Sequence, residues 1–223
     1  MLFYGQDNQI ISPDPKDLAV FDADLKPLGF SYKPFQVPGD LQIPVSIALD
    51  SSGSMDGHMG KVVAATKEFM SSLPDFTLCR LLTFNDDIRH LTPVNNSGLA
   101  SCPSSAWLLS QPLKAYGTTA LYKAIDSGFD KKHKTSFANI VIVVTDGKNT
   151  ADFGLSLSSL KASKAKSNSK LFVFWAGNYE KGHLRGLADL EFVSTQNLES
   201  ELEDFFHSLG VSLSGLQTLH IRK

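Results

Sequence analysis

The sequence predicts an α/β protein of the Rossmann-like, doubly wound type, with a mostly parallel sheet flanked by helices on both faces. Short apolar runs rich in β-branched residues, such as IPVSIALD at 43–50 and NIVIVVTDG at 139–147, are typical of strands buried on both faces. Segments with apolar residues at helical spacing lie between such runs. Alternating strands and helices predict βαβ units, which form parallel sheets covered by helices.

The predicted elements follow one another from residue 43 to residue 210. A helix follows the first strand and ends at Pro74, because proline cannot continue a helix. The segment DIRHLTPV is expected at a sheet edge, where its proline is tolerated. Further strands are predicted at 76–84, 170–178 and 191–195, a loop at 95–105, and helices at 106–113, 119–130, 156–169 and 197–210.

Residues 1–40 differ from the rest and are expected to form a β-rich N-terminal extension, with the main domain at 41–223. The stretch LAVFDADLKPLGFSYKPF alternates apolar and polar residues around an expected turn at Lys26–Pro27. It is too apolar for a free tail, so we expect it to pack on the main domain.

The composition excludes several classes of protein. The chain of 223 residues is 42% hydrophobic and has a formal net charge of -2, which gives no basic field for nucleic acid. No run approaches the roughly 18 apolar residues of a membrane span. The N-terminus lacks the features of a signal peptide, which favours the cytoplasm, although an excised extracellular domain fits as well. We expect the isolated chain to be monomeric.

Two cysteines and two tryptophans are expected to be structural. Cys79 lies in a predicted buried strand, and we expect it and Cys102 to be reduced thiols, with a disulfide as the alternative. Trp107 and Trp175 are expected in the core.

Acidic and hydroxyl side chains gather where predicted strands end. Asp50 ends the first strand, Ser52 and Ser54 follow it at every second position, and Asp146 ends a later strand. A threonine pair, Thr118 and Thr119, precedes a predicted helix. Because ligands of such sheets bind beyond the carboxyl ends of the strands, we expect these groups on one rim. Carboxylates and hydroxyls are hard oxygen ligands that suit Mg²⁺ or Mn²⁺.

These residues resemble the metal-ion-dependent adhesion site of von Willebrand factor type A domains, also called integrin I-like domains. The D-x-S-x-S motif is matched by DSSGS at 50–54, the family's threonine by Thr119, with Thr118 as the rival, and its T-D-G element by TDG at 145–147. The resemblance covers about residues 41–210.

The resemblance implies a role for each residue of the set. Ser52 and Ser54 would bind Mg²⁺ or Mn²⁺ directly, Thr119 would do so in the high-affinity state, and Asp50 and Asp146 would act mostly through water. The cation would then accept a Glu or Asp carboxylate from a partner protein. The resemblance therefore implies a protein-binding adhesion or assembly module that is not an enzyme.

Three alternatives remain open from the sequence. Ser52, Ser54 and Thr119 stand where helix caps belong, although capping does not explain the two acids beside them. A Mg²⁺-dependent phosphoryl-transfer enzyme is the second, but Ser52 stands where such enzymes carry a second acid. The third is a structural module whose metal only braces the loops. Asp86 and Asp87 are expected to form a solvated turn rather than an acid/base pair.

Overall fold

The computed structural model describes residues 3–4, 10–11, 20–21, 26–28, 30–34, 42–92, 99–129, 138–151, 153–177, 183–214 and 217–221. The chain divides into two compact units, one of Gln42–Phe206 and one of Met1–Leu41 with His207–Lys223. In these described ranges, no helix is both long and apolar enough to cross a membrane.

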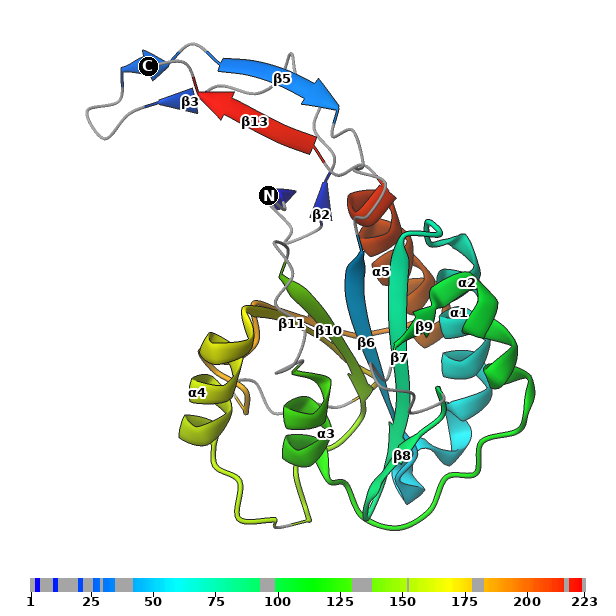
Figure 1. Cartoon of the computed structure of the whole chain (residues 1–223). Helices are drawn as coiled ribbons and strands as arrows, with labels where there is room; N and C mark the ends of the chain where they lie inside the picture. Colours follow the sequence, from blue (N-terminus) through cyan, green and yellow to red (C-terminus); the bar gives the residue numbers. More distant parts are fainter. Residues whose placement is uncertain are drawn as a thin grey trace. The chain divides into compact units, whose positions relative to one another are not determined.

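The larger unit is built on one sheet with the strand order β12-β11-β10-β6-β7-β8, and β9 also pairs with β7 (Figure 1). Strands β6, β7, β10, β11 and β12 are parallel neighbours, whereas β8 and β9 run antiparallel to β7. The mostly parallel, helix-flanked sheet predicted from the sequence is therefore confirmed. The strands are β6 (Ile43–Asp50), β7 (Thr77–Phe84), β8 (Ile88–His90), β9 (Ala100–Ser101), β10 (Asn139–Thr145), β11 (Ser169–Trp175) and β12 (Leu190–Val193).

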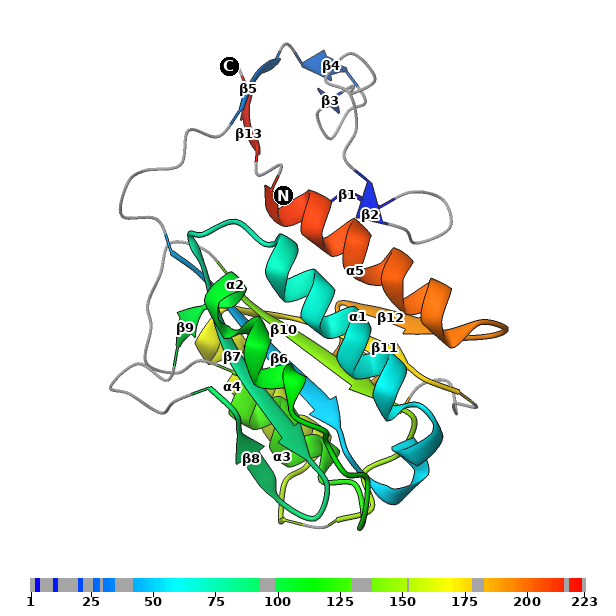
Figure 2. The same ribbon diagram turned by 90° about the vertical axis from the view of Figure 1, so that its right-hand side faces the viewer.

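Helices cover both faces of this sheet. Helices α1 and α5 lie side by side over one face (Figure 2), where Phe69 of α1 stacks on Phe206 of α5 with ring centroids 4.6 Å apart. Helices α3 and α4 pack on the other face, in a core cluster that includes Ala48 of β6 and Val143 of β10. The helices are α1 (Met59–Ser72), α2 (Cys102–Ser105), α3 (Leu121–Gly128), α4 (Leu157–Ser167) and α5 (Leu198–Ser214), with two 3-10 helices, η2 (Gly53–Gly57) and η3 (Ala106–Ser110).

Side chains of β6 alternate between these two faces, as the pleat of a strand requires. All eight residues of β6 are buried, including its last residue, Asp50.

Helix α3 comes close to the sheet at Gly128, where a Cβ would lie 2.7 Å from Cγ1 of Val141. The glycine therefore allows the helix that follows Thr119 to approach β10 closely.

The smaller unit pairs strands from both ends of the chain. Strand β5 (Phe30–Pro34) runs antiparallel to β13 (Gln217–Ile221), which the sequence did not predict. Four strands of two residues form two further antiparallel pairs. Strand β1 (Phe3–Tyr4) pairs with β2 (Ile10–Ile11), and β3 (Val20–Phe21) pairs with β4 (Pro27–Leu28). Pro27 is the first residue of β4 and pairs with Phe21, so the connection between β3 and β4 comprises residues 22–26 and overlaps the turn predicted at Lys26–Pro27 only at Lys26. The expected packing of residues 1–40 on the main domain rests largely on side chains outside those described and stays a prediction.

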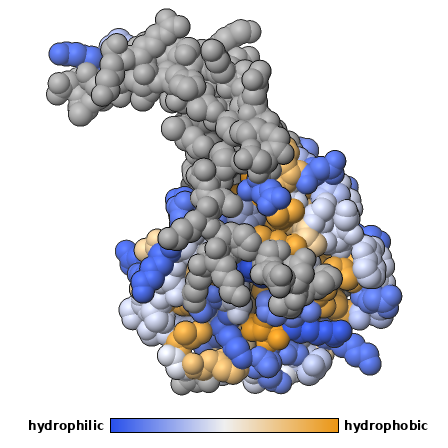
Figure 3. All heavy atoms as spheres, in the orientation of Figure 1, coloured by the Kyte–Doolittle hydropathy of each residue, from blue (hydrophilic) through white to orange (hydrophobic). Residues whose placement is uncertain are grey.

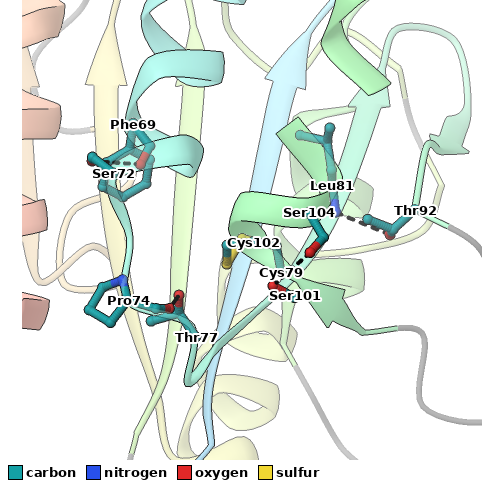
Figure 4. Close-up of a disulfide and its surroundings, with 10 residues drawn as sticks. All are labelled: Phe69, Ser72, Pro74, Thr77, Cys79, Leu81, Thr92, Ser101, Cys102 and Ser104. Atoms are coloured by element: carbon teal, nitrogen blue, oxygen red, sulfur yellow. Dashed lines mark hydrogen bonds between the residues drawn. A yellow bond between two sulfur atoms is a disulfide. The ribbon is translucent and has the colours of Figure 1, made fainter. Parts of the chain in front are cut away.

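Cys79 and Cys102 form a disulfide, with Cα atoms 4.8 Å apart (Figure 4). The prediction of reduced thiols is therefore wrong. The predicted loop at 95–105 contains β9, which pairs Ala100 with Cys79, so the chain brings Cys102 beside β7 as α2 begins.

The two tryptophans have opposite environments. Trp175 is buried in the core as predicted, whereas Trp107 on η3 is 64% exposed, so its predicted core position is wrong. On the face that Figure 3 shows, hydrophobic residues lie among polar ones. One exposed tryptophan fits that pattern, because much of any folded surface is apolar.

Candidate metal centre

The sheet brings Asp50 and Asp146 to the same edge. Strands β6 and β10 are parallel neighbours, with Leu49 paired to Val144, so both strands end at the same edge of the sheet. The hydroxyl of Thr145, the last residue of β10, donates a hydrogen bond to Oδ2 of Asp50. The arrangement of the two acids on one rim, expected from the sequence, therefore follows from the register.

Hydrogen bonds and a close contact connect the D-x-S-x-S residues to Asp146. The Ser52 amide donates to Oδ1 of Asp50 at 2.8 Å, and the Ser52 and Ser54 hydroxyl oxygens lie 3.3 Å apart. The Ser54 hydroxyl donates to Oδ1 of Asp146 at 2.8 Å. Asp50 and Ser52 are buried, whereas Ser54 is exposed at the surface. The four side chains thus form a continuous polar row from the core to solvent.

Thr119 lies close to Gly147, the residue that follows Asp146. It is buried, and a Cβ on Gly147 would lie 3.4 Å from its hydroxyl oxygen, so the hydroxyl faces the residue after Asp146. The neighbouring Thr118 has its hydroxyl 2.6 Å from Oδ1 of Asp86, to which it donates. Of the two threonines, Thr119 is therefore the one placed beside the TDG segment.

Backbone hydrogen bonds connect the loops that carry these side chains. The Tyr116 amide donates to the carbonyl of Ser51 at 2.9 Å, and the Gly53 amide donates to the carbonyl of Gly117 at 3.2 Å. The Thr150 amide donates to the carbonyl of Thr119 at 2.9 Å. The three loops are thus joined to one another by the protein's own main chain.

Capping does not account for the hydroxyl groups. Ser52 occupies the N-cap position of η2, yet its side chain makes no capping hydrogen bond. The N-cap of α3 is Ala120, one residue after Thr119. The hydroxyl of Ser52 therefore caps no helix, and Thr119 does not occupy the N-cap position of α3.

The electrostatics of the rim favour a cation. Burial raises the pKa of Asp50 from 3.8 to about 6, and the charge of Asp146 adds to the rise, whereas hydrogen bonds from Thr145 and Ser52 oppose it. An ionised Asp50 is therefore costly without a counter-charge nearby. The oxygen donors present fit a hard divalent cation, and in the described ranges no group of three or more His, Cys, Asp or Glu side chains offers a different metal site.

Two side chains that shape the rim were not predicted from the sequence. Thr145 stands in the TDG segment directly before Asp146, so its bond to Asp50 could have been sought from the strand register. Asp86 was assigned to a solvated turn, which its exposure supports, but its contact with Thr118 was not foreseen. The two residues are 32 positions apart, and no sequence pattern links them.

The chain belongs to the von Willebrand factor type A domain family, whose family model matches residues 45–208. Domains of this family are generally protein-interaction or adhesion modules and are typically not enzymes. No match was found among the curated proteins.

Solved structures show the same fold. A von Willebrand factor type A protein from Catenulispora acidiphila superposes with a TM-score of 0.64 at 22% identity, covering 78% of this chain and 43% of that one. The conserved hypothetical protein BatB from Bacteroides thetaiotaomicron gives 0.57 at 17% identity, over 75% of this chain and 97% of that one. Proximal thread matrix protein 1 from the mussel byssus gives 0.60 at 16% identity, over 78% and 48%. The chain thus spans less than half the length of the first and third of these.

Proposed function

We propose that this domain binds Mg²⁺ or Mn²⁺ at the rim and uses the cation to bind a carboxylate of a partner protein. Ser52, Ser54 and Thr119 would supply neutral oxygen ligands, and Asp50 and Asp146 would supply the negative charge. The observation that carries the proposal is the polar row that runs from buried Asp50 through both serines to Asp146.

The donor set suits a cation that still has to accept an outside ligand. Bound there, the cation would act as an electrophile, because the neutral hydroxyls quench little of its charge. Two carboxylates match the charge of one divalent ion, and a site with so few charges is expected to bind weakly, on the order of 10⁻⁴–10⁻³ M.

A metal that only braces the loops is the second candidate, and the hydrogen bonds argue against it. The main chain already joins the three loops, through Tyr116 to Ser51, Gly53 to Gly117 and Thr150 to Thr119. A brace would add little to loops that hold one another. The same pre-formed loops would lower the ordering cost of binding a partner, which supports the bridging role.

Titration of Mn²⁺ followed by electron paramagnetic resonance tests the metal site. Asp146→Ala should abolish binding, because it removes one of the two charges. Asp56→Ala should not, although Asp56 is an exposed acid in η2, two residues after Ser54. Equal Mn²⁺ affinity in wild type and Asp146→Ala would refute the site.

Capture of partners from cells of the source organism tests the bridge. Wild type should retain its partner in Mg²⁺ and release it in EDTA. Thr119→Ala should keep much of the metal affinity and lose most of the partner, because the resemblance implies that this hydroxyl engages when the carboxylate arrives. If the metal merely braces the loops, Thr119→Ala should lose metal affinity and partner binding in proportion. If Asp146→Ala captured the partner in EDTA as well as wild type does in Mg²⁺, bridging would be excluded.

A further inference from the structure

We propose that Asp86 is a positioning residue that fixes the loop before α3, so that Thr119 is held beside the rim. The residue lies in the turn between β7 and β8, outside the set proposed to hold the metal. The part of the inference that concerns metal rests on the proposed function, whereas the part that concerns the loop does not.

The Asp86 carboxylate binds two groups of one residue. Oδ1 accepts hydrogen bonds from both the amide and the hydroxyl of Thr118, each at 2.6 Å. These bonds hold the pKa of Asp86 below its usual value, so the group is ionised at neutral pH. Hydrogen bonds to an ionised acceptor are stronger than neutral ones, which suits a contact made at an exposed site.

The loop is shaped to receive this carboxylate. Gly117 has a φ of +77°, and a Cβ there would lie 2.4 Å from Oδ2 of Asp86. Only glycine combines that backbone conformation with room for the carboxylate. The carbonyl of the same Gly117 accepts the Gly53 amide from the D-x-S-x-S loop. The Asp86 contact is thus one residue away from the connection to the serines.

Neighbours of Asp86 bind the same segment. The Asn85 carbonyl accepts the Ala120 amide at 2.7 Å, and Asp87 accepts a hydrogen bond from Lys123 at 2.5 Å. Three consecutive residues of the turn therefore hold positions 118, 120 and 123, on both sides of Thr119.

The opposite side of Thr119 is held by the loop after β10. The Thr119 amide donates to the hydroxyl of Thr150 at 2.9 Å, and the Thr119 carbonyl accepts the amides of Thr150 and Ala151. Thr119 is thus fixed between two loops, and on the β7–β8 side the Asp86 carboxylate accepts two hydrogen bonds from the residue next to it. Without the Asp86 carboxylate, Thr118 should become mobile first, and the hydroxyl of Thr119 should then no longer be held in one orientation.

Mn²⁺ titration with two variants tests the metal part. Asp86→Ala removes the acceptor, and loss of a residue that orients a ligand should weaken Mn²⁺ binding roughly tenfold. Asp86→Asn keeps an oxygen at Oδ1 and should restore most of the affinity. Asp75→Ala is the control for charge, because Asp75 is also exposed but precedes the opposite end of β7.

A double-mutant cycle separates positioning from direct ligation. If Asp86 acts through Thr119, adding Asp86→Ala to Thr119→Ala should change the Mn²⁺ affinity by less than about twofold. The same tenfold loss in both backgrounds would show that Asp86 acts independently of Thr119 and would overturn the inference. Unchanged affinity in Asp86→Ala alone would overturn it as well.

Amide hydrogen exchange in EDTA tests the loop without any metal. Exchange at Thr118, Thr119 and Ala120 should be faster in Asp86→Ala and near wild type in Asp86→Asn, while Val143 in β10 stays protected in both. Unchanged exchange at the three amides would overturn the inference. If wild type binds no Mn²⁺, the proposed function fails, yet this exchange result still decides whether Asp86 fixes the loop.

Discussion

The hydroxyl of Ser54 donates a hydrogen bond to Oδ1 of Asp146 at 2.8 Å, although 92 residues separate the two in the chain. This contact joins the loop after β6 to the loop after β10 at the exposed end of the rim. Both atoms belong to residues proposed to surround the cation, so the contact gives the metal-free site a polar arrangement that a cation would replace with its own bonds.

Mg²⁺ or Mn²⁺ should stabilise the fold, because a cation offsets the two neighbouring acids. At a metal concentration of about 100 times the dissociation constant, linkage gives about 2.7 kcal/mol, or a rise in Tm of roughly 5–10 °C for a chain of this size. Thermal melting in EDTA and in Mg²⁺ at 100 times its dissociation constant, on the order of 10–100 mM for the affinity expected above, measures the shift. Asp146→Ala should show none. Superimposable wild-type curves in the two buffers would contradict the prediction.

Metal-free stability should depend on the ionisation of Asp50. Its pKa in the folded protein is about 6, above the usual 3.8, so the folded state binds the proton more tightly than the unfolded state. The protonated form of Asp50 therefore stabilises the folded state fully below about pH 4, and this stabilisation is lost as the pH rises through about 6. At 1.36 kcal/mol per pKa unit, the free energy of unfolding falls by about 3 kcal/mol.

Urea denaturation between pH 4 and pH 7 in EDTA measures this effect. The readout is the difference in unfolding free energy between wild type and Asp50→Asn, which cancels the other titrating groups. That difference should move in favour of Asp50→Asn as the pH rises. A difference that is constant across the range would show that Asp50 does not titrate there.

Removing the disulfide should destabilise the protein by about 3 kcal/mol. Cys79 and Cys102 are 23 residues apart, and a cross-link that closes a loop of about this length restricts the unfolded chain by that amount. Urea denaturation of the Cys79→Ala/Cys102→Ala double variant measures the loss. A reductant should lower the stability of wild type but leave the double variant unchanged; no response in wild type would mean that the bond is absent.

Gly128→Ala should destabilise by about 1–3 kcal/mol, because a Cβ at this site would lie 2.7 Å from Cγ1 of Val141 and force α3 away from β10. Gly60 in α1 is the matched control, since a Cβ there meets nothing within 4 Å. Gly60→Ala should be neutral or stabilise by up to about 1 kcal/mol. Equal effects of the two changes in urea denaturation would count against the close approach of α3.

The sequence predicted the main elements of the larger unit because each has a strong local signal. Buried strands such as Ile43–Asp50 are continuous apolar runs, and α1 has a clear helical period that Pro74 ends. The two-residue strand β9 has no such signal, so the segment around it was predicted as a loop. The pairing of β5 with β13 joins residues near opposite ends of the chain, which local patterns do not encode.

The candidate site also contains some contacts that could be predicted from the sequence and others that could not. Asp50, Ser52 and Ser54 lie within five positions of one another, and parallel strands bring Asp146 to the same edge, so their proximity could be predicted. The contact of Asp86 with Thr118 depends on how the β7–β8 turn folds over the loop before α3, and nothing in the spacing of the two residues encodes it. The disulfide also depends on a pairing, that of β7 with β9, which was not predicted.

The disulfide has a further consequence for how the molecule responds to a break in its chain. Cys79 lies on β7, inside the sheet, and Cys102 lies at the start of α2. A protease that cuts once anywhere between them yields two pieces that remain covalently attached. Such a nicked molecule would migrate as one band on a denaturing gel without reductant and as two bands with it. The disulfide would therefore keep α2 covalently attached to β7 after a cut in the segment that joins them.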